Sequence, residues 1–225
     1  MASKFRCEIK FAGAAAFFIV FALLTGLVAA QSSSPSPSNP AEQTLEDFSK
    51  AEPDGFPQGW QVSRSEAATR KAYVISREGN LSFLRTTGID EQMRIKKRIA
   101  WDPKTYPIVT WRWRLRAAPQ NQGLIAAVFI TLDTDLMMIP VFTKYVWNSL
   151  GKVGALKEGG MFSGSEIVVR TAVQPVGEWV DERVDAYADF VRIHKHDPAP
   201  QAWGISLVAA PGIEVDFGHI GLAKQ

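Results

Sequence analysis

Apolar residues from position 41 onward recur mostly at every second position, in short runs separated by Gly, Pro, Asn and Asp. Side chains alternate between the two faces of a β-strand, so this period predicts strands with one buried face. The predicted strands cover residues 73–77, 81–86, 92–101, 108–116, 124–132, 137–147, 166–171, 179–184, 203–208 and 215–222. Many strands of this length bury themselves best as two packed sheets. We therefore predict an all-β domain, a two-sheet antiparallel β-sandwich of the jelly-roll type.

One segment departs from the two-residue period. Residues at helical spacing within it are Tyr187, Phe190, Val191 and His194. Asp185 precedes them and can accept a hydrogen bond from a backbone N–H of the first helical turn. The sequence therefore predicts one short helix packed on the sandwich.

The N-terminal residues differ in composition from the rest. Residues 1–30 begin with a basic segment, continue with an apolar run and end in Val28-Ala29-Ala30, which is typical of a secretory signal peptide. The apolar run is close to the ~20 residues that span a bilayer, so an N-terminal membrane anchor is the alternative. Residues 31–40 are rich in Ser and Pro and predict a linker. We expect residues 41–225 to form a periplasmic or secreted domain, or one anchored at the inner membrane.

Composition narrows the chemistry of this domain. The single cysteine, Cys7, precedes the apolar run, so the exported part has no disulfide, thiolate nucleophile or cysteine-bound metal. The whole chain carries 25 basic and 23 acidic residues, and the part after the N-terminal segment carries 22 of each. A neutral domain has no global attraction for nucleic acid, so we expect no nucleic-acid partner, and any anion site must be local.

The segment 110–116, TWRWRLR, alternates bulky apolar and basic residues. On a strand, Trp111 and Trp113 share one face while Arg112 and Arg114 share the other. Burying indoles is favourable at roughly 25 cal/mol per Å², whereas buried guanidiniums each need a partner. We predict that the tryptophans lie in the core and that the arginines face outward.

The preceding strand repeats this arrangement, with Arg94, Lys96 and Arg98 on its outward face. A polar turn joins residues 92–101 to residues 108–116 and predicts that the two strands pair, which would place six cations on one sheet face. Like charges opposite one another across strands are destabilising, so the cations need carboxylate partners or an anionic ligand. Both explanations remain open from the sequence.

The candidate ligand-binding residues are these outward cations together with two aromatic residues that share one face of another strand. They are Arg94, Lys96, Arg98, Arg112, Arg114, Tyr145 and Trp147. The cations suit an acidic ligand, and aromatic rings can stack on a sugar, although a core position is the alternative for both aromatic residues.

Catalytic and metal chemistry have weaker support. His194 and His196 supply two metal-binding nitrogens without a clear third ligand, so we expect no metal and no cofactor. Glycoside cleavage needs two carboxyl groups ~5–10 Å apart, and residues 178–189 contain several. No pair among them stands out, so a carbohydrate-active enzyme is an alternative and not the leading hypothesis.

Several short motifs occur in a recognisable order. They are the Pro-x-x-x-Trp-x-Trp of Pro107, Trp111 and Trp113, then Tyr145-Val146-Trp147, Gly177-Glu178-Trp179-Val180-Asp181-Glu182, Asp185-Ala186-Tyr187-Ala188-Asp189-Phe190, Gly204-Ile205 and Asp216-Phe217-Gly218-His219-Ile220. Their order and spacing resemble the bacterial exported family called domain of unknown function 3047 (DUF3047), over most of the domain from about Phe48 onward. The resemblance implies a jelly-roll sandwich shaped like carbohydrate-binding modules, and implies no particular activity.

These observations together lead to one hypothesis and two alternatives. We expect a noncatalytic exported β-sandwich that binds an acidic or neutral envelope glycan or another anionic polymer. The alternatives are a carbohydrate-active enzyme that uses carboxylates of residues 178–189, and a structural envelope protein. Membrane contact is expected only through the N-terminal segment, if that segment is retained.

Overall fold

The computed structural model describes residues 42–119, 122–134, 137–159 and 164–225. The chain divides after Pro37 into two units, and all described residues belong to the second, Ser38–Gln225. The predicted signal peptide or anchor, residues 1–30, and the predicted linker, residues 31–40, lie outside the described residues. No helix in the described part of the chain has the length and apolar character needed to cross a membrane.

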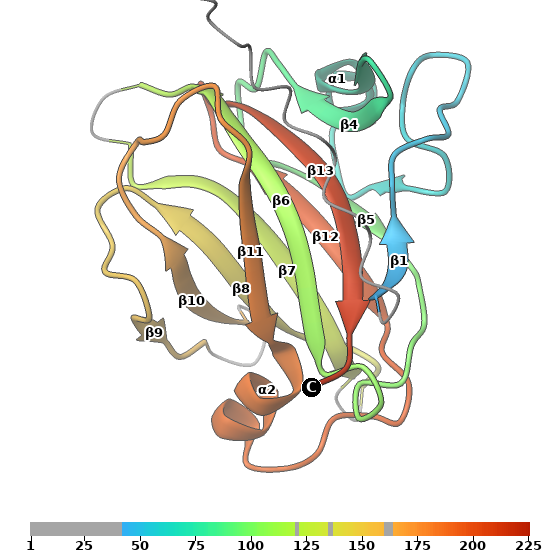
Figure 1. The fold of residues 1–225 in the computed structure, drawn as a ribbon, viewed down its shortest axis with the longest axis vertical. Coiled ribbons are helices and arrows are strands. Elements are labelled where there is room, and N and C mark those ends of the chain that lie inside the picture. Colours follow the sequence, from blue (N-terminus) through green and yellow to red (C-terminus); the bar gives the residue numbers. More distant parts are fainter. Residues whose placement is uncertain (1–41, 120–121, 135–136, 160–163) are drawn as a thin grey trace, which may run out of the picture. The chain divides into compact units, whose positions relative to one another are not determined.

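Two facing β-sheets make up the described part of the domain (Figure 1). Within it, the first sheet has the strand order β11-β6-β13-β4-β3. The strand β1 lies on the same side of β13 as β4: β4 pairs with the N-terminal part of β13, and β1 pairs with its C-terminal part. These strands are β11 (Val180–Asp185), β6 (Ile108–Ala117), β13 (Glu214–Ala223), β4 (Leu81–Thr86), β3 (Tyr73–Glu78) and β1 (Glu42–Glu46). All pairings in this sheet are antiparallel.

The second sheet has the order β2-β5-β12-β7-β8-β10-β9 among the described residues. Its strands are β2 (Gln61–Val62), β5 (Met93–Lys97), β12 (Gly204–Ala209), β7 (Leu124–Thr134), β8 (Pro140–Asn148), β10 (Ser165–Arg170) and β9 (Leu156–Lys157). One pair, β8 with β10, is parallel, because the long connection between them returns the chain to the start of β8. The predicted two-sheet β-sandwich is confirmed, with this one parallel pair as a difference in detail.

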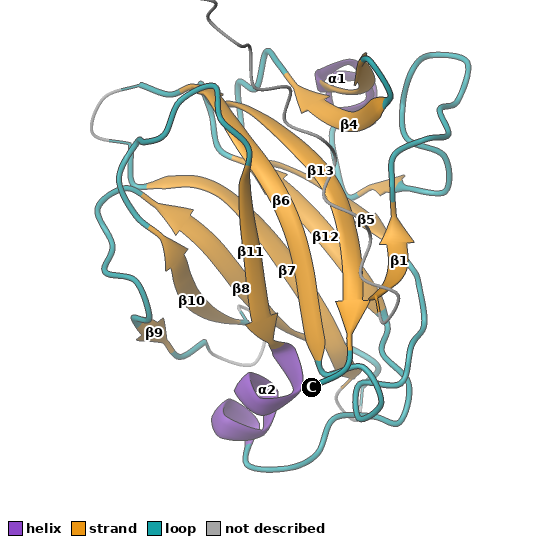
Figure 2. Cartoon of the chain, viewed as in Figure 1, coloured by secondary structure: helices purple, strands orange, loops and turns teal. Residues whose placement is uncertain are grey.

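In the described part of the chain, two short helices accompany the sheets (Figure 2). The predicted one is α2 (Ala186–His194), and the Asp185 carboxylate accepts a hydrogen bond from the Ala188 N–H at 2.8 Å, as an N-terminal cap does. The other is α1 (Glu66–Ala72), which the sequence analysis did not predict. Its sequence, EAATRKA, has no stripe of large apolar residues that would show a helical period.

The core lies between the sheets and is rich in aromatic residues. Trp111 is 2% exposed and Trp113 is fully buried, as predicted. Their rings meet edge to face at 5.6 Å, and Trp113 contacts the ring of Trp147 at 5.5 Å. Aromatic pairs in this geometry add ~0.5–1.5 kcal/mol beyond the burial of their area. The prediction that β6 hides its indoles and presents its arginines outward is confirmed.

The predicted pairing of residues 92–101 with residues 108–116 is wrong. The first segment forms β5, which pairs with β12 and β2 in the second sheet. The second forms β6, which pairs with β11 and β13 in the first sheet. The alternation of apolar and basic residues fixes which face of each strand is buried. It is satisfied equally well when the two strands pair in one sheet and when they lie in different sheets. The six cations therefore lie on opposite outer faces of the sandwich.

Candidate functional site

A pocket of about 360 Å³ lies on the outer face of the second sheet. It crosses four neighbouring strands, β5, β12, β7 and β8, and is open to solvent. Three of its lining residues are the predicted cations of the β5 segment, and none of its described lining residues is an Asp or Glu. The lining is Arg94, Lys96, Arg98, Phe129, Thr131, Ile139, Pro140, Phe142, Trp203, Gly204, Ile205 and Ser206.

The cations of this pocket lack carboxylate partners. Among the described residues, Arg94, Lys96 and Arg98 form no ion pair, whereas Lys97 in the same segment binds Glu46 at 2.6 Å. Arg94 is half-buried and donates only to the Ser63 hydroxyl, at 3.2 Å. Burial lowers the pKa of its guanidinium. The folded protein thus holds partly desolvated positive charge that an anion could compensate.

Three aromatic rings, those of Phe129, Phe142 and Trp203, form a further part of the pocket wall. Phe129 and Phe142 are stacked, with centroids 5.2 Å apart and an interplanar angle of 10°. The guanidinium of Arg94 lies 5.8 Å from the Phe129 ring, and that of Arg98 lies 4.4 Å from the Trp203 ring. Cation–π contacts of this kind hold a guanidinium against an aromatic face without neutralising its charge. The rings therefore orient the cations and leave their charge available.

A close approach between two strands shapes the pocket. Gly204, at the start of β12, has a φ of 139°, and a Cβ added there would lie 2.1 Å from the carbonyl oxygen of Lys97. Only glycine fits this position, because any side chain would overlap the backbone of the β5 segment. Gly204 thus brings Trp203 next to Arg98.

The other predicted cations, Arg112 and Arg114, lie on the outer face of the first sheet. There they have acidic partners: Arg112 pairs with Asp181 at 3.2 Å, and Arg114 pairs with Asp216 at 2.6 Å. These ion pairs correspond to one of the two explanations that the sequence left open, in which carboxylates such as Asp181 are the partners of the outward cations. For these two residues, internal carboxylates compensate the charge, so an anionic ligand is not required.

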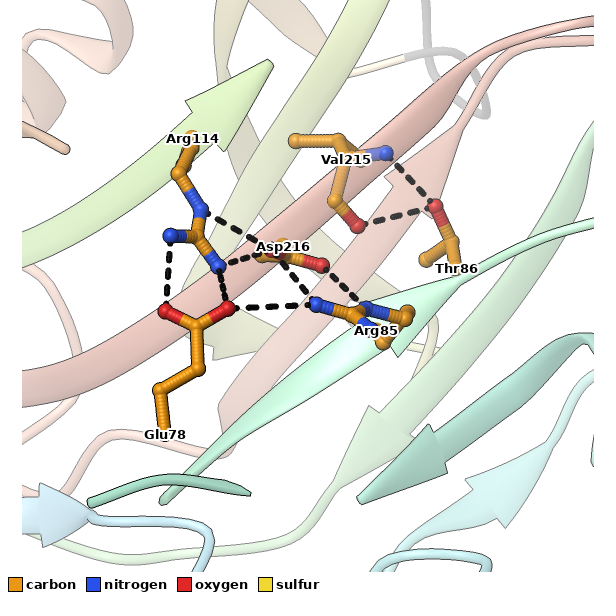
Figure 3. A network of polar contacts seen from close by, with 6 residues as sticks. All are labelled: Glu78, Arg85, Thr86, Arg114, Val215 and Asp216. Atoms are coloured by element: carbon orange, nitrogen blue, oxygen red, sulfur yellow. Dashed lines mark hydrogen bonds and ion pairs between the residues drawn. The ribbon is translucent and has the colours of Figure 1, made fainter. Parts of the chain in front are cut away.

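Arg114 belongs to a network centred on a buried carboxylate (Figure 3). The Asp216 side chain has no exposed surface, and it accepts hydrogen bonds from Arg114 and from Arg85, the latter at 3.1 Å. Glu78 accepts two hydrogen bonds from the Arg114 guanidinium, both at 2.8 Å. The hydrogen bond to Glu78 raises the pKa of Arg114, and the same bond lowers the pKa of Glu78. A hollow beside this network is lined by Glu78, Arg85, Arg114, Arg116 and Gly177. Glu78 and Asp216 compensate Arg85 and Arg114, whereas Arg116 forms no ion pair among the described residues.

Aromatic residues cover this network from outside the sheet. Trp179 and Phe83 meet edge to face at 5.5 Å, and the Arg114 guanidinium lies 4.6 Å from the Trp179 ring. Gly218 leaves room for this layer, because a Cβ there would lie 2.6 Å from Cγ of Arg112. The face is therefore packed, which explains why only 12% of the Arg114 side chain is exposed.

The predicted stacking residues Tyr145 and Trp147 are both fully buried. Their rings point into the core, where Tyr145 contacts Trp111 and Trp147 contacts Trp113. The Tyr145 hydroxyl donates to Asp189 at 3.1 Å, and the Trp147 indole N–H donates to the carbonyl of Ala172 at 2.6 Å. Their assignment to a ligand-binding surface is wrong, because the strand turns this face inward and leaves no ring surface for a sugar.

The carboxylates of residues 178–189 have structural partners. Asp181 pairs with Arg112, Asp185 caps α2, and Asp189 accepts from Tyr145 and from Arg192. Glu182 lies at the edge of the sandwich and accepts from Arg170 at 2.6 Å and from the Trp113 indole at 3.1 Å. None of these groups lines the pocket on the second sheet. The pocket on the second sheet therefore holds no pair of these carboxylates.

His194 and His196 lie with ring centroids 6.1 Å apart. Among the described residues, no group of three or more His, Cys, Asp or Glu is placed so that it could hold a metal ion. Burial lowers the pKa of His194, whose ring packs against Phe190 at 4.3 Å. His194 therefore contributes to the packing of α2.

The sequence analysis missed the aromatic part of the pocket. Phe129 is buried and lies on β7, whose two faces are both largely apolar, and Phe142 lies on β8, which mixes apolar and polar residues, so the alternation gives no sign that these two rings line an outer pocket. Trp203 was placed at the start of a predicted strand without a role. Its position directly before Gly204 was the available signal, since a glycine at a strand start can mark close backbone approach.

Comparison with known proteins gives a similarity of fold. No family model matches the chain, and no curated protein matches it. Similar solved structures include a carbohydrate-binding module that recognises mannan, TmCBM27, at 11% identity over 82% of this chain and 98% of that chain, with a TM-score of 0.39. The family 30 carbohydrate-binding module of a Clostridium thermocellum cellulosomal cellulase matches at 9% identity over 82% and 98%, with a TM-score of 0.44. Endoglucanase 3 of Trichoderma harzianum, from family GH12, matches at 8% identity over 82% and 97%, with a TM-score of 0.43. Such similarity in strand arrangement carries no information about ligand or activity.

Proposed function

We propose that this domain is a noncatalytic module that binds an acidic glycan of the cell envelope in the pocket on the second sheet. The proposal includes export of the domain through residues 1–30 and membership of the DUF3047 family. The observation that carries it is the set of three cations, Arg94, Lys96 and Arg98, which line one pocket without an acidic partner among the described residues.

An acidic sugar meets the two requirements of this pocket. Its carboxylate compensates the cations, and a hydrogen bond that involves a charged group contributes ~1.5–3 kcal/mol. Its ring can lie against Trp203, which is half-buried and already holds Arg98 over its face. The hydroxyls of Ser206 and Thr131 supply further hydrogen-bonding groups in the same pocket.

Calorimetric titration with an oligogalacturonate and with its methyl ester tests the proposal. The ester removes the charge of each carboxylate and adds only a methyl group, so we expect the ester to bind at least about tenfold more weakly. Added salt should weaken binding of the acid, because exposed charges are screened within ~10 Å at 0.1 M salt. Equal binding of acid and ester would contradict the proposal.

Charge reversal locates the site. The variant Arg98→Glu should lose at least tenfold in affinity for the acid, since it places a carboxylate in the pocket. Arg183→Glu is the matched control: this exposed arginine lies on β11 in the other sheet, outside the pocket. The control should bind like the natural protein. A normal affinity in Arg98→Glu would show that the ligand binds elsewhere.

A further inference from the structure

The pocket on the second sheet is divided into a charged half and an apolar half. The three cations come from β5 and the residue directly after it, at one side. The apolar residues Phe129 and Phe142 come from β7 and β8, at the other side. Three strand spacings separate β5 from β8, or roughly 14 Å. The two sets meet at Phe129, because the Arg94 guanidinium and the Lys144 ammonium of β8 each lie 5.8 Å from its ring centroid and the side chain is buried. The apolar surface that remains for a ligand is therefore that of Phe142, Ile139 and Pro140.

A polysaccharide without an attached hydrocarbon chain would match only the charged half of the pocket. Sugar hydroxyls placed against the Phe129 and Phe142 side would find few partners, and a hydroxyl buried without a hydrogen bond costs ~1–3 kcal/mol. In this half of the pocket the polar side chain is that of Thr131, beside Ile139 and Pro140. A hydrocarbon chain suits this surface better, because it loses no hydrogen bond on leaving water.

The chain directly before this apolar half is also apolar and exposed. Met137 and Met138 are each 64% exposed, and they precede Ile139 and Pro140, which line the pocket. Methionine side chains adapt their shape to apolar partners, and they are often used at binding surfaces for such ligands. Exposed apolar residues beside an apolar pocket wall indicate a larger apolar contact than the pocket alone provides.

We infer that the ligand is an amphiphile: an acidic sugar that carries an alkyl or acyl chain, with its acidic group against Arg94, Lys96 and Arg98 and its chain against the apolar surface at Phe142. This inference rests on the proposed glycan-binding function and narrows its ligand to the acidic glycolipid class. Charge complementarity favours this direction of binding, because the three cations that line the pocket all come from the β5 segment, whereas β8 contributes one cation, Lys144, beside the Phe129 ring.

Three defined compounds separate the contributions of charge and chain. Octyl glucuronide carries both, methyl glucuronide lacks the long chain, and octyl glucoside lacks the charge. Titrated below their micelle concentrations, octyl glucuronide should bind at least tenfold more tightly than each of the other two. Equal binding of octyl and methyl glucuronide would overturn the inference and leave the proposed glycan-binding function intact. Octanoate is a fourth compound, which carries the charge and the chain without the sugar; if it bound as tightly as octyl glucuronide, the glycan-binding function would be contradicted and only a site for acidic amphiphiles would remain.

Variants assign the two ends of the ligand. Phe142→Ser should weaken octyl glucuronide at least tenfold and leave methyl glucuronide unchanged, whereas Arg98→Glu should weaken both. Because Phe142 is partly buried, Met138→Ser provides a second variant at an exposed position, with a smaller loss of the same kind. Leu150→Ser is the control, since Leu150 is 72% exposed and lies outside the pocket lining. A chain-dependent affinity unchanged in both Phe142→Ser and Met138→Ser would overturn the inference.

Discussion

Arg114 and Asp216 face each other across the β6–β13 pair, with Nη2 of the arginine 2.6 Å from Oδ2 of the aspartate. The Asp216 side chain is fully buried, although it lies on the outer face of the sheet. Arg85 and the Arg114 guanidinium enclose it, and Trp179 and Phe83 cover the arginine. The sandwich thus has a polar network on an outer face, outside the core between the sheets, and the carboxylate at the centre of this network is shielded from solvent.

The first prediction concerns this buried carboxylate. Asp216→Asn keeps the shape of the side chain and removes the charge that two guanidiniums share, so it should reduce the free energy of unfolding by ~3–5 kcal/mol. Urea unfolding followed by circular dichroism measures the loss. Asp181→Asn is the control: Asp181 also binds an arginine, but its side chain is 73% exposed, so the expected loss is ~0–1 kcal/mol. Equal losses in the two variants would contradict the assigned role of burial.

The fold could be predicted from the sequence to a large extent, because the alternation of β6 and β5 determines which faces are buried. Trp111 and Trp113 lie in the core, and Met93 and Ile95 do so as well. The partners of each strand were harder to predict. An amphipathic strand buries its apolar face equally well in either sheet of a sandwich, so the short polar turn after β5 was a misleading guide to pairing.

The site could be predicted only in part. Arg94, Lys96 and Arg98 line the pocket, but Arg112 and Arg114 lie on the opposite outer face of the sandwich. What distinguishes the two sets is the location of carboxylates such as Asp216, which lies about a hundred residues away in the chain. Such long-range partners leave no local signal in a single sequence. The aromatic residues of the pocket could not be predicted for the same reason, since they come from strands that are brought together only in the folded sheet.

The second prediction concerns Gly204. Gly204→Ala places a Cβ 2.1 Å from the Lys97 carbonyl oxygen, so β12 and β5 must move apart. We expect a loss of about 4 kcal/mol or more in the free energy of unfolding, because the obstacle is backbone. Gly79→Ala is the control: its φ is +57° and no atom lies within 4 Å, so only backbone strain of ~1–2 kcal/mol applies. A similar loss in both would mean that close approach contributes little.

The third prediction concerns acid. The hydrogen bond from Arg114 lowers the pKa of Glu78 below its ordinary value of 4.5. A lowered folded pKa contributes stability that is present above 4.5 and is lost as the pH falls through the folded pKa. Because the Glu78 side chain is 48% exposed, this contribution is ~0–1 kcal/mol. Glu78→Gln should therefore be slightly less stable than the natural protein at neutral pH, and the difference should shrink as the pH falls below 4.5 and through the lowered folded pKa of Glu78. A difference that persists in acid would have another cause.

The fourth prediction concerns the ion pair between Arg170 and Glu182 at the edge of the sandwich. Burial raises the pKa of Glu182, and the Arg170 hydrogen bond opposes that effect. A carboxyl group whose folded pKa is raised costs stability as the pH rises through that pKa, because the folded state then holds a desolvated charge. Arg170→Met removes the opposing group, so the cost should grow and extend to higher pH. At neutral pH we expect a loss of ~2–4 kcal/mol, since the Glu182 side chain is 10% exposed.

The same variant also tests how Arg170 acts, because its guanidinium lies 5.6 Å from the Trp147 ring. If charge compensation dominates, urea unfolding of Arg170→Met should show stability recovering as the pH falls through the raised folded pKa of Glu182 toward 4.5, because the folded state then takes up a proton there. The double variant Arg170→Met/Glu182→Gln should then recover most of the loss at neutral pH, with little pH dependence. A loss that is constant with pH and not relieved by Glu182→Gln would show instead that Arg170 stabilises the edge by packing on Trp147. The pH dependence thus separates the electrostatic role of Arg170 from its packing role.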